Sequence, residues 1–348
     1  MSNYVDKHLN EELKEYFKVF STSYPHFLDK YIDSLELQRL STIGQFCGCD
    51  YTKLYNIKYW YSRLDHSIVT ALMAWNFTKD KKQTIAALFH DLGTPAFSHC
   101  IDYLLGDTTK QETSERDIAD FISNSDKLKE YLELDDTTIE DIISLEKYTV
   151  LENKKPKLCV DRLEGVLHTG LIWRQFWQLE DIRSIYSNII VLKNEDKEDE
   201  IGFKDINSAF KFFEGVYKYS MVLQQNENKF ALQFISDCIK YLIDCGRLNI
   251  DDLYKYSEKE IVELFTRDIK LSKSWDIFSN TEQIKRSSRK PNVEYFVSVD
   301  TKKRYVVPLC MHNGKIVRLN TVSKECKNLL DDYMNYKDSK YAYIKNDD

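Results

Sequence analysis

Apolar side chains recur at intervals of three and four residues along most of this chain. In YSRLDHSIVTALMAW (61–75) they fall on one helical face, and in IAALF (85–89) they are continuous. Such spacing predicts helices with a buried face. Gly93 and Pro95 follow the second segment, and both residue types are typical of a helix end. Because the same spacing recurs in residues 35–46, 115–148 and 210–220, we expect a mainly α-helical fold.

The pattern changes to alternate positions from residue 292, in VEYFVSVD and then in KRYVVPLCMHNGKIVRLNTV. Alternation of this kind is typical of β-strands. Asn313 and Gly314 lie between the two halves of the second segment, and this dipeptide favours a two-residue hairpin turn. The sequence therefore predicts a small antiparallel β-hairpin or sheet near the C-terminus of a helical body.

The charged run NEDKEDE (194–200) contains no apolar residue and is the best internal boundary. On this basis we expect a helical packing or assembly segment over 1–34 and a main helical domain over 35–192. A charged connector would follow over 193–203. A second helical half over 204–280 would complete the site of the main domain, and a small β-containing lobe would occupy 281–348.

Composition limits the class of protein. Of 348 residues, 43% are apolar, which is enough for a substantial core. The net charge of −7 argues against duplex nucleic acid as the main partner, although a local basic site stays open. The sequence has no signal-peptide pattern at its start and no apolar run of about 20 residues, so we expect a cytoplasmic protein without a membrane partner. The eight cysteines lack metal-binding pair spacing and are expected to be reduced, mostly buried thiols.

The dipeptide His90-Asp91 stands at the end of the apolar segment 85–89. A buried imidazole beside a carboxylate is costly to desolvate unless both groups are hydrogen-bonded or bound to a cation. His66 lies upstream, at the start of another apolar helix, and Asp161 begins a third. Two neutral imidazoles and two carboxylates would neutralise one divalent metal ion and leave coordination positions open, as in catalytic sites. The sequence therefore predicts these four residues as metal ligands, without distinguishing Mn, Fe, Mg, Ni or Zn.

This order of ligands resembles that of the HD-domain metal-dependent phosphohydrolases. The motifs LELQRLSTIGQFCGC (35–49), YSRLDHS (61–67), HDLGTPAFSHCID (90–102) and VDRLEGVL (160–167) follow those of the deoxynucleoside triphosphate triphosphohydrolase branch. The resemblance covers most of residues 35–320. It implies an HD-domain helical body, a nucleotide substrate split into nucleoside and inorganic triphosphate, and assembly into homo-oligomers of two or more chains.

Two further positions suggest chemistry beside the metal. Arg63 stands about one helical turn before His66, so it could bind phosphate there, or it could pair with Asp65. His99 and Asp102 are three residues apart, so the carboxylate could hold the imidazole tautomer and raise its pKa. A lone histidine is often a satisfied core residue. The resemblance over residues 95–102 instead implies that His99 and Asp102 are catalytic, with His99 protonating the leaving oxygen.

By resemblance, Gln45 and Tyr217 would face the nucleotide sugar, and Arg162 would contact phosphate. From the residues alone, Gln45 is equally well a solvated glutamine near a helix end, and Tyr217 belongs to an apolar helical stripe of the core. Lys154, Lys155 and Lys157 read as a solvated basic loop. For KRSSRK (285–290) and Lys302, Lys303 and Arg304, solvated charge is the default, and a regulatory nucleotide or single-stranded nucleic acid site is the alternative.

The sequence departs from the family at Thr94, Gln111 and Gly165. Thr94 and Gln111 replace polar residues of the family's active site, and Gly165 replaces an aromatic residue expected beside the ribose 2′-hydroxyl. No preference for deoxyribose over ribose therefore follows. Two alternatives stay open: hydrolysis of another phosphoester, such as a nucleoside monophosphate, a cyclic nucleotide or an alarmone, or a weakly catalytic nucleotide sensor or nucleic-acid-binding protein.

Overall fold

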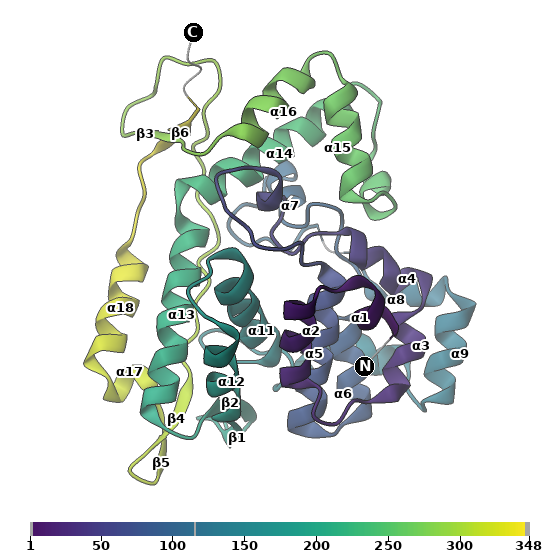
Figure 1. Ribbon diagram of the computed structural model, residues 1–348, viewed down its shortest axis with the longest axis vertical. Helices are drawn as coiled ribbons and strands as arrows, with labels where there is room; N and C mark the ends of the chain where they lie inside the picture. Colours follow the sequence, from purple (N-terminus) through teal and green to yellow (C-terminus); the bar gives the residue numbers. More distant parts are fainter. Residues whose placement is uncertain (1–2, 115, 345–348) are drawn as a thin grey trace.

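Helices dominate the computed structural model, which describes residues 3–114 and 116–344 (Figure 1). The prediction of a mainly α-helical fold is confirmed. The helices are α1 (Asn3–His8), α2 (Glu11–Phe20), α3 (Asp29–Ile32), α4 (Leu35–Arg39), α5 (Arg63–Thr78), α6 (Lys81–Phe89), α7 (Cys100–Leu104), α8 (Ile118–Ser123), α9 (Asp126–Leu134), α10 (Ile139–Ile143), α11 (Val160–His168), α12 (Leu179–Ser187), α13 (Ile206–Gln224), α14 (Asn226–Asp244), α15 (Glu258–Arg267), α16 (Leu271–Asn280), α17 (Leu319–Val322) and α18 (Lys324–Asn335). Short 3-10 turns cover His26–Leu28, Leu40–Thr42, Cys49–Tyr51, Leu145–Lys147 and Ile250–Tyr254, and a π-helical turn covers Thr169–Trp173.

The helix α5 is the central element of the N-terminal body. Ser62 and Asp65 form a capping box at its start, in which each side chain accepts the backbone N–H of the other residue. The residues from 63 to 74 are all buried, so α5 is covered on every side. Only Lys79 and Asp80 separate it from α6. Lys79 ends α5 in the left-handed conformation and the Asp80 side chain caps α6, which together turn the chain back against α5.

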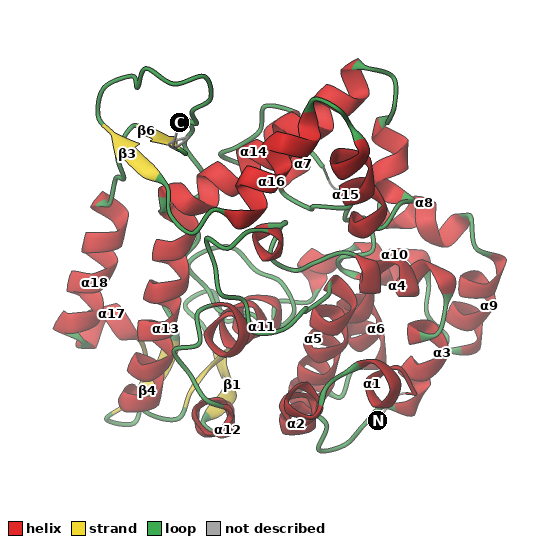
Figure 2. Ribbon diagram, turned by 45° about the horizontal axis from the view of Figure 1, so that its top comes forward, coloured by secondary structure: helices red, strands yellow, loops and turns green. Residues whose placement is uncertain are grey.

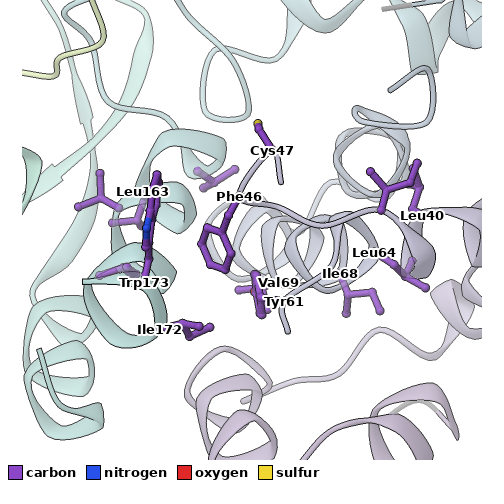
Figure 3. Close-up of a cluster of buried hydrophobic side chains, with 14 of the residues drawn as sticks. Leu40, Phe46, Cys47, Tyr61, Leu64, Ile68, Val69, Leu163, Ile172 and Trp173 are labelled. Atoms are coloured by element: carbon purple, nitrogen blue, oxygen red, sulfur yellow. The ribbon is translucent and has the colours of Figure 1, made fainter. Parts of the chain in front are cut away.

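Helix α11 lies between the N-terminal body and the C-terminal half, in contact with α5 on one side and α13 on the other (Figure 1). Figure 3 shows Phe46 between the α5 side chains and Trp173 of the π-helical turn. The rings of Phe46 and Trp173 are 5.3 Å apart. One hydrophobic cluster extends from Tyr4 to Ala342, so the two halves share a core. In the part of the chain that the structure describes, no helix has the length and apolar character needed to cross a membrane.

The strands form two small groups at the margin of the helical body (Figure 2). The larger sheet has the order β1 (Ile189–Lys193), β2 (Asp199–Phe203), β4 (Leu309–His312) and β5 (Lys315–Arg318). All pairs are antiparallel except β2 with β4. The hairpin predicted at Asn313 and Gly314 is confirmed, and both residues have the positive φ that this turn requires, 50° and 73°.

The charged run 194–200, expected to be a connector, is a solvated turn only in part. Residues 195–198 do form an exposed turn, but residues 199–203 form strand β2, whose Ile201 and Phe203 are fully buried. The charge of Glu200, also fully buried, is balanced by Arg318 of β5, with Nη1 at 2.6 Å from Oε1. A partner far along the chain therefore allows an acidic residue inside the sheet, which local charge did not reveal.

The strand expected from residue 292 onward is also absent. Burial alternates along residues 293–299, yet only Val297 makes a bridge, to Ala342. The alternation thus reflects packing on one side of an extended segment without a neighbouring strand along its length. The second sheet instead pairs β3 (Lys285–Ser287) with β6 (Tyr341–Tyr343).

Two carboxyl groups meet in the interior beside Gly44. A methyl group at Gly44 would lie 3.1 Å from Oδ2 of Asp50 and 3.2 Å from Oε2 of Glu258. Oδ1 of Asp50 and Oε2 of Glu258 are buried and have no hydrogen-bond partner among the described residues. Burial raises the pKa of Asp50 to about 6, and burial together with the Asp50 charge raises the pKa of Glu258 well above its usual range. The folded protein therefore favours protonated carboxyls here.

We predict that Asp50→Asn stabilises the protein at neutral but not at acid pH. The folded state holds the Asp50 proton up to about pH 6 whereas the unfolded chain releases it near pH 3.8, so wild-type stability falls as the pH rises through this window. The neutral amide of the Asp50→Asn variant does not titrate, so its stability does not fall in this pH window. We expect the free energy of unfolding in urea to rise by on the order of 1–3 kcal/mol at pH 7.5, with little change at pH 4. An equal effect at both pH values would contradict this assignment.

Candidate metal centre and substrate cavity

A cavity of about 710 Å³ lies among α5, α11, α13 and the segment 301–306. This volume is in the range of pockets that hold small molecules. The residues predicted from sequence that line it are Gln45, Arg63, His66, His90, Asp91, His99, Asp161 and Arg162. Of the remaining two, Asp102 lies behind His99, and Tyr217 is outside the cavity lining.

The four predicted metal ligands converge at one wall of this cavity. Nε2 of His66 lies 3.0 Å from Oδ1 of Asp161 and 3.2 Å from Nε2 of His90, and that last atom is 3.5 Å from Oδ1 of Asp161. The carboxylate of Asp91 lies 3.9 Å from Nε2 of His66 and 3.8 Å from Nε2 of His90. The start of α5, the end of α6 and the start of α11 thus bring two imidazole nitrogens and two carboxylates together.

The remaining ring nitrogens decide how these imidazoles point. Nδ1 of His90 is hydrogen-bonded to the carbonyl of Ala87 at 2.7 Å, and Nδ1 of His66 is hydrogen-bonded to the carboxylate of Glu164. With both Nδ1 atoms occupied, both Nε2 atoms face the space between the ligands. Burial lowers the pKa of His66, but Glu164, Asp161 and Asp91 together raise it to about 10. This donor set fits a divalent cation.

Sequence reasoning missed Glu164, which is 0% exposed. Its Oε1 accepts from the hydroxyls of Tyr16 at 3.0 Å and Tyr61 at 2.7 Å, and its Oε2 is bonded to Nδ1 of His168 at 2.8 Å and to His66. Burial alone would raise the pKa of Glu164, but the two imidazoles hold it below its usual range. The spacing of 161, 164 and 168 on one helical face was the available signal. His168, one helical turn further along α11, helps to hold this carboxylate.

We predict that Glu164→Gln weakens metal binding. An amide cannot accept from all four donors, so the His66 ring loses part of its support. The Mn²⁺ affinity, measured by calorimetric titration, should fall about 10- to 100-fold. The matched control is Glu258→Gln, an identical change at another fully buried glutamate, which should leave the Mn²⁺ affinity unchanged. Equal affinities in the two variants would contradict the supporting role of Glu164.

Arg63 lies beside the candidate metal ligands. Its Nη1 donates to Oδ2 of Asp91 at 2.8 Å and its Nε to Oγ of Ser98 at 3.2 Å. Asp65, the alternative partner considered from sequence, is instead bound within the capping box and accepts from Tyr4. The guanidinium therefore stands in the cavity next to a ligand carboxylate.

The His99 imidazole lies between a carboxylate and a guanidinium. Nδ1 is 2.9 Å from Oδ2 of Asp102, and Nε2 is 3.0 Å from Nη2 of Arg304. Because a guanidinium only donates, Nε2 accepts, and Nδ1 carries the proton donated to Asp102. Asp102 does raise the His99 pKa, as expected, but burial and the Arg304 charge outweigh it and lower this pKa to about 4. Burial, together with Arg304, which is distant in sequence, outweighs the effect of the neighbouring acid.

Strained backbone gathers around His99. Phe97 and Ser98, the two residues before it, have φ values of 62° and 48°. Cys47 and Gln111, which line the cavity, have φ values of 51° and 56°. Residues other than glycine seldom adopt this left-handed conformation, and such strain is concentrated at functional sites. The strained backbone therefore indicates a functional site at this cavity, independently of the candidate metal ligands.

The wall formed by the loop 154–157 and the segment 301–306 is cationic. Lys154, Lys155, Lys302 and Arg304 line the cavity there, so these residues are not only solvated loop charge as the sequence suggested. Burial and the charges of Lys302 and Arg304 lower the pKa of Lys155. In all, six cationic side chains line the cavity (Arg63, Lys154, Lys155, Arg162, Lys302 and Arg304) against four carboxylates (Asp91, Glu112, Glu152 and Asp161). This wall is suited to an anion.

Arg162 braces that loop. Its Nη1 donates to Oδ1 of Asn153 at 2.6 Å and to the carbonyl of Lys157 at 2.8 Å, and its Nη2 is paired with Glu152. Its guanidinium is therefore engaged with its own protein beside the cavity. Through these bonds Arg162 holds the loop that carries Lys154 and Lys155.

Of the two residues expected to face the sugar, Gln45 lines the cavity and Tyr217 does not. Gln45 lines the cavity, and its buried Oε1 has no hydrogen-bond partner among the described residues. Tyr217 does not reach the cavity, because its hydroxyl donates to Asp332 of α18 at 2.6 Å. Each residue of a helix turns by about 100°, so the face of α13 toward the cavity carries Tyr219 instead. A methyl group at Gly165 would meet nothing within 4 Å, so the missing aromatic residue leaves open space.

The chain matches no family model. It is 23% identical over 308 residues to YdhJ of Bacillus subtilis (strain 168), described as uncharacterized, and the alignment covers 87% of this chain and 89% of that protein. A hypothetical protein from Aquifex aeolicus has a crystal structure similar to this one, with a TM-score of 0.60 and 15% identity over 90% of this chain and 91% of that one. This likeness shows a common fold.

Proposed function

We propose that this protein is an HD-domain metal-dependent phosphohydrolase that cleaves nucleoside triphosphates into nucleoside and inorganic triphosphate. One observation carries the proposal: a cluster of two imidazoles and two carboxylates shares a cavity with an excess of cationic side chains. The first group suits a divalent metal and the second suits a chain of phosphates. The order of the sequence motifs supports the same reaction.

The metal ligands would be His66, His90, Asp91 and Asp161. A divalent ion bound there would supply Lewis acidity, both for a water molecule and for a phosphoryl oxygen. Glu164 and the Ala87 carbonyl keep the two Nε2 atoms directed at the ion site. Arg63, beside Asp91, is suited to neutralise an oxygen of the phosphate next to the ligands.

The other cationic side chains and His99 would bind the phosphate chain and supply a proton. In the proposed reaction water adds to the α-phosphorus, the bond to the 5′ oxygen breaks, and that oxygen takes up a proton. Lys155 and Arg304 would hold the phosphate chain. Nε2 of His99 faces the cavity, while Asp102 keeps the other ring nitrogen as a donor, so His99 is placed to hold or move the proton.

A nucleotide sensor with little turnover is the second candidate. It is favoured by the hydrogen bond from Arg304 to Nε2 of His99, because this bond occupies the atom that the reaction needs. Such a protein would bind nucleotides in the same cavity without releasing products.

The direct test is chromatography of the products formed by metal-replete protein from each ribo- and deoxyribonucleoside triphosphate. We expect nucleoside and inorganic triphosphate, and a loss of kcat by about 1000-fold or more in His90→Ala, because a metal ligand is removed. The control is His26→Ala, at an exposed histidine that pairs with Asp29. Release of orthophosphate or pyrophosphate would contradict the proposal. Saturable binding without any product would favour the sensor.

We further predict little discrimination between ribose and deoxyribose. Gly165 leaves open space in the cavity, so no side chain at this position excludes a 2′-hydroxyl. The kcat/KM values for paired ribo- and deoxyribonucleotides should agree within about tenfold, a difference of less than about 1.4 kcal/mol. Gly165→Tyr should lower the ribonucleotide value more than the deoxyribonucleotide value. An equal loss for both sugars would contradict this placement of the sugar.

A further inference from the structure

Arg304 reaches the cavity from a segment that is tied down on several sides. The backbone N–H of Lys302 donates to the carbonyl of Thr108 at 3.2 Å, and Gln224 of α13 donates to the carbonyl of Lys302 at 2.9 Å. The N–H of Arg304 donates to the hydroxyl of Tyr333 in α18 at 2.9 Å. The backbone position of Arg304 is therefore set by elements from both halves of the chain.

The Arg304 guanidinium has two neutral partners. Its Nη2 donates to Nε2 of His99 at 3.0 Å and to Oε1 of Gln111 at 2.8 Å. Among the described residues Arg304 forms no ion pair with a carboxylate, and Lys155 and Lys302 line the same wall. A guanidinium in this position gains more from a doubly hydrogen-bonded phosphate than from an imidazole and an amide.

We propose that Arg304 couples phosphate binding to the protonation of His99, an inference that rests on the proposed function. Without substrate, the guanidinium occupies the lone pair of His99 Nε2. A phosphate of the bound substrate takes over the guanidinium, and Nε2, freed from Arg304, takes up one proton from solvent. His99 then holds this proton toward the cavity, with its Nδ1 proton still donated to Asp102. The proton passes to the leaving oxygen, which returns His99 to the neutral form.

The groups around His99 agree with this exchange. Asp102 of α7 faces Nδ1, and the charges that act on the ring from the cavity side are those of Arg304 and Arg63. Both are cations, which oppose a second proton on the ring while the phosphate is absent. An anion bound between them removes that opposition. The Oε1 of Gln111 accepts from Arg304 and so helps to place the guanidinium.

The test uses inorganic triphosphate as the probe, with metal-replete protein and the variants Arg304→Gln and Lys302→Gln. Both variants remove one positive charge from the same segment, but only Arg304 contacts His99. Triphosphate affinity, measured by calorimetric titration, should fall at least tenfold in Arg304→Gln and no more than about threefold in Lys302→Gln. Titration of the His99 ring by NMR should show a pKa at least one unit higher in Arg304→Gln than in wild type or Lys302→Gln.

Triphosphate should also raise the His99 pKa of the wild-type protein by one unit or more. An unchanged His99 titration in Arg304→Gln, or equal affinity losses in the two variants, would overturn the inference. Arg304→Lys serves if the glutamine variant does not fold, because it keeps the charge but not the two-pronged geometry; we expect a threefold to tenfold loss of affinity. Neither measurement needs turnover. Triphosphate binding through Arg304 without nucleotide hydrolysis would therefore refute only the proposed function.

Discussion

The buried carboxylate of Glu164 is the interaction on which the site depends most. Four donors from α2, the segment before α5, α5 itself and α11 converge on its two oxygens, so one side chain joins three helices and aims His66. A carboxylate without exposure to water is stable only when every lone pair is used, and here each one is. The same bonds that hold the helices together therefore orient the candidate metal ligands.

A second constraint is the imbalance of charge across the cavity. The wall with the candidate metal ligands concentrates carboxylates and imidazoles, and the wall formed by residues 154–157 and 301–306 concentrates lysine and arginine side chains. Lys155 lies close to the cations Lys302 and Arg304, and the carboxylates of Asp91 and Asp161 both lie against the imidazoles of His66 and His90. A cation at one wall and a polyanion at the other would satisfy both. Arg304 sits where the two walls meet, against His99.

Much of this arrangement was predictable because it depends on local spacing. Helical periodicity placed α5, α6 and α11, and the polar residues at their ends indicated His66, His90, Asp91 and Asp161. Asn313 and Gly314 specified their hairpin through backbone conformation alone. The predictions that were wrong concerned residues whose partners lie far along the chain. Glu200 belongs to a charged run in the sequence, but in the structure it pairs with Arg318. Tyr217 and Tyr219 lie on different faces of α13, and only Tyr219 faces the cavity.

The sequence by itself determined the helical class of the fold, the C-terminal hairpin and the set of candidate ligands, because each follows from residue type and short-range spacing. Only the tertiary structure decided which charges act on which groups. The pKa of His99 is lowered instead of raised because the ring is buried and because Arg304, about two hundred positions away, lies 3.0 Å from its Nε2. Electrostatic interactions act through space and depend on burial, so contacts across the fold determine them.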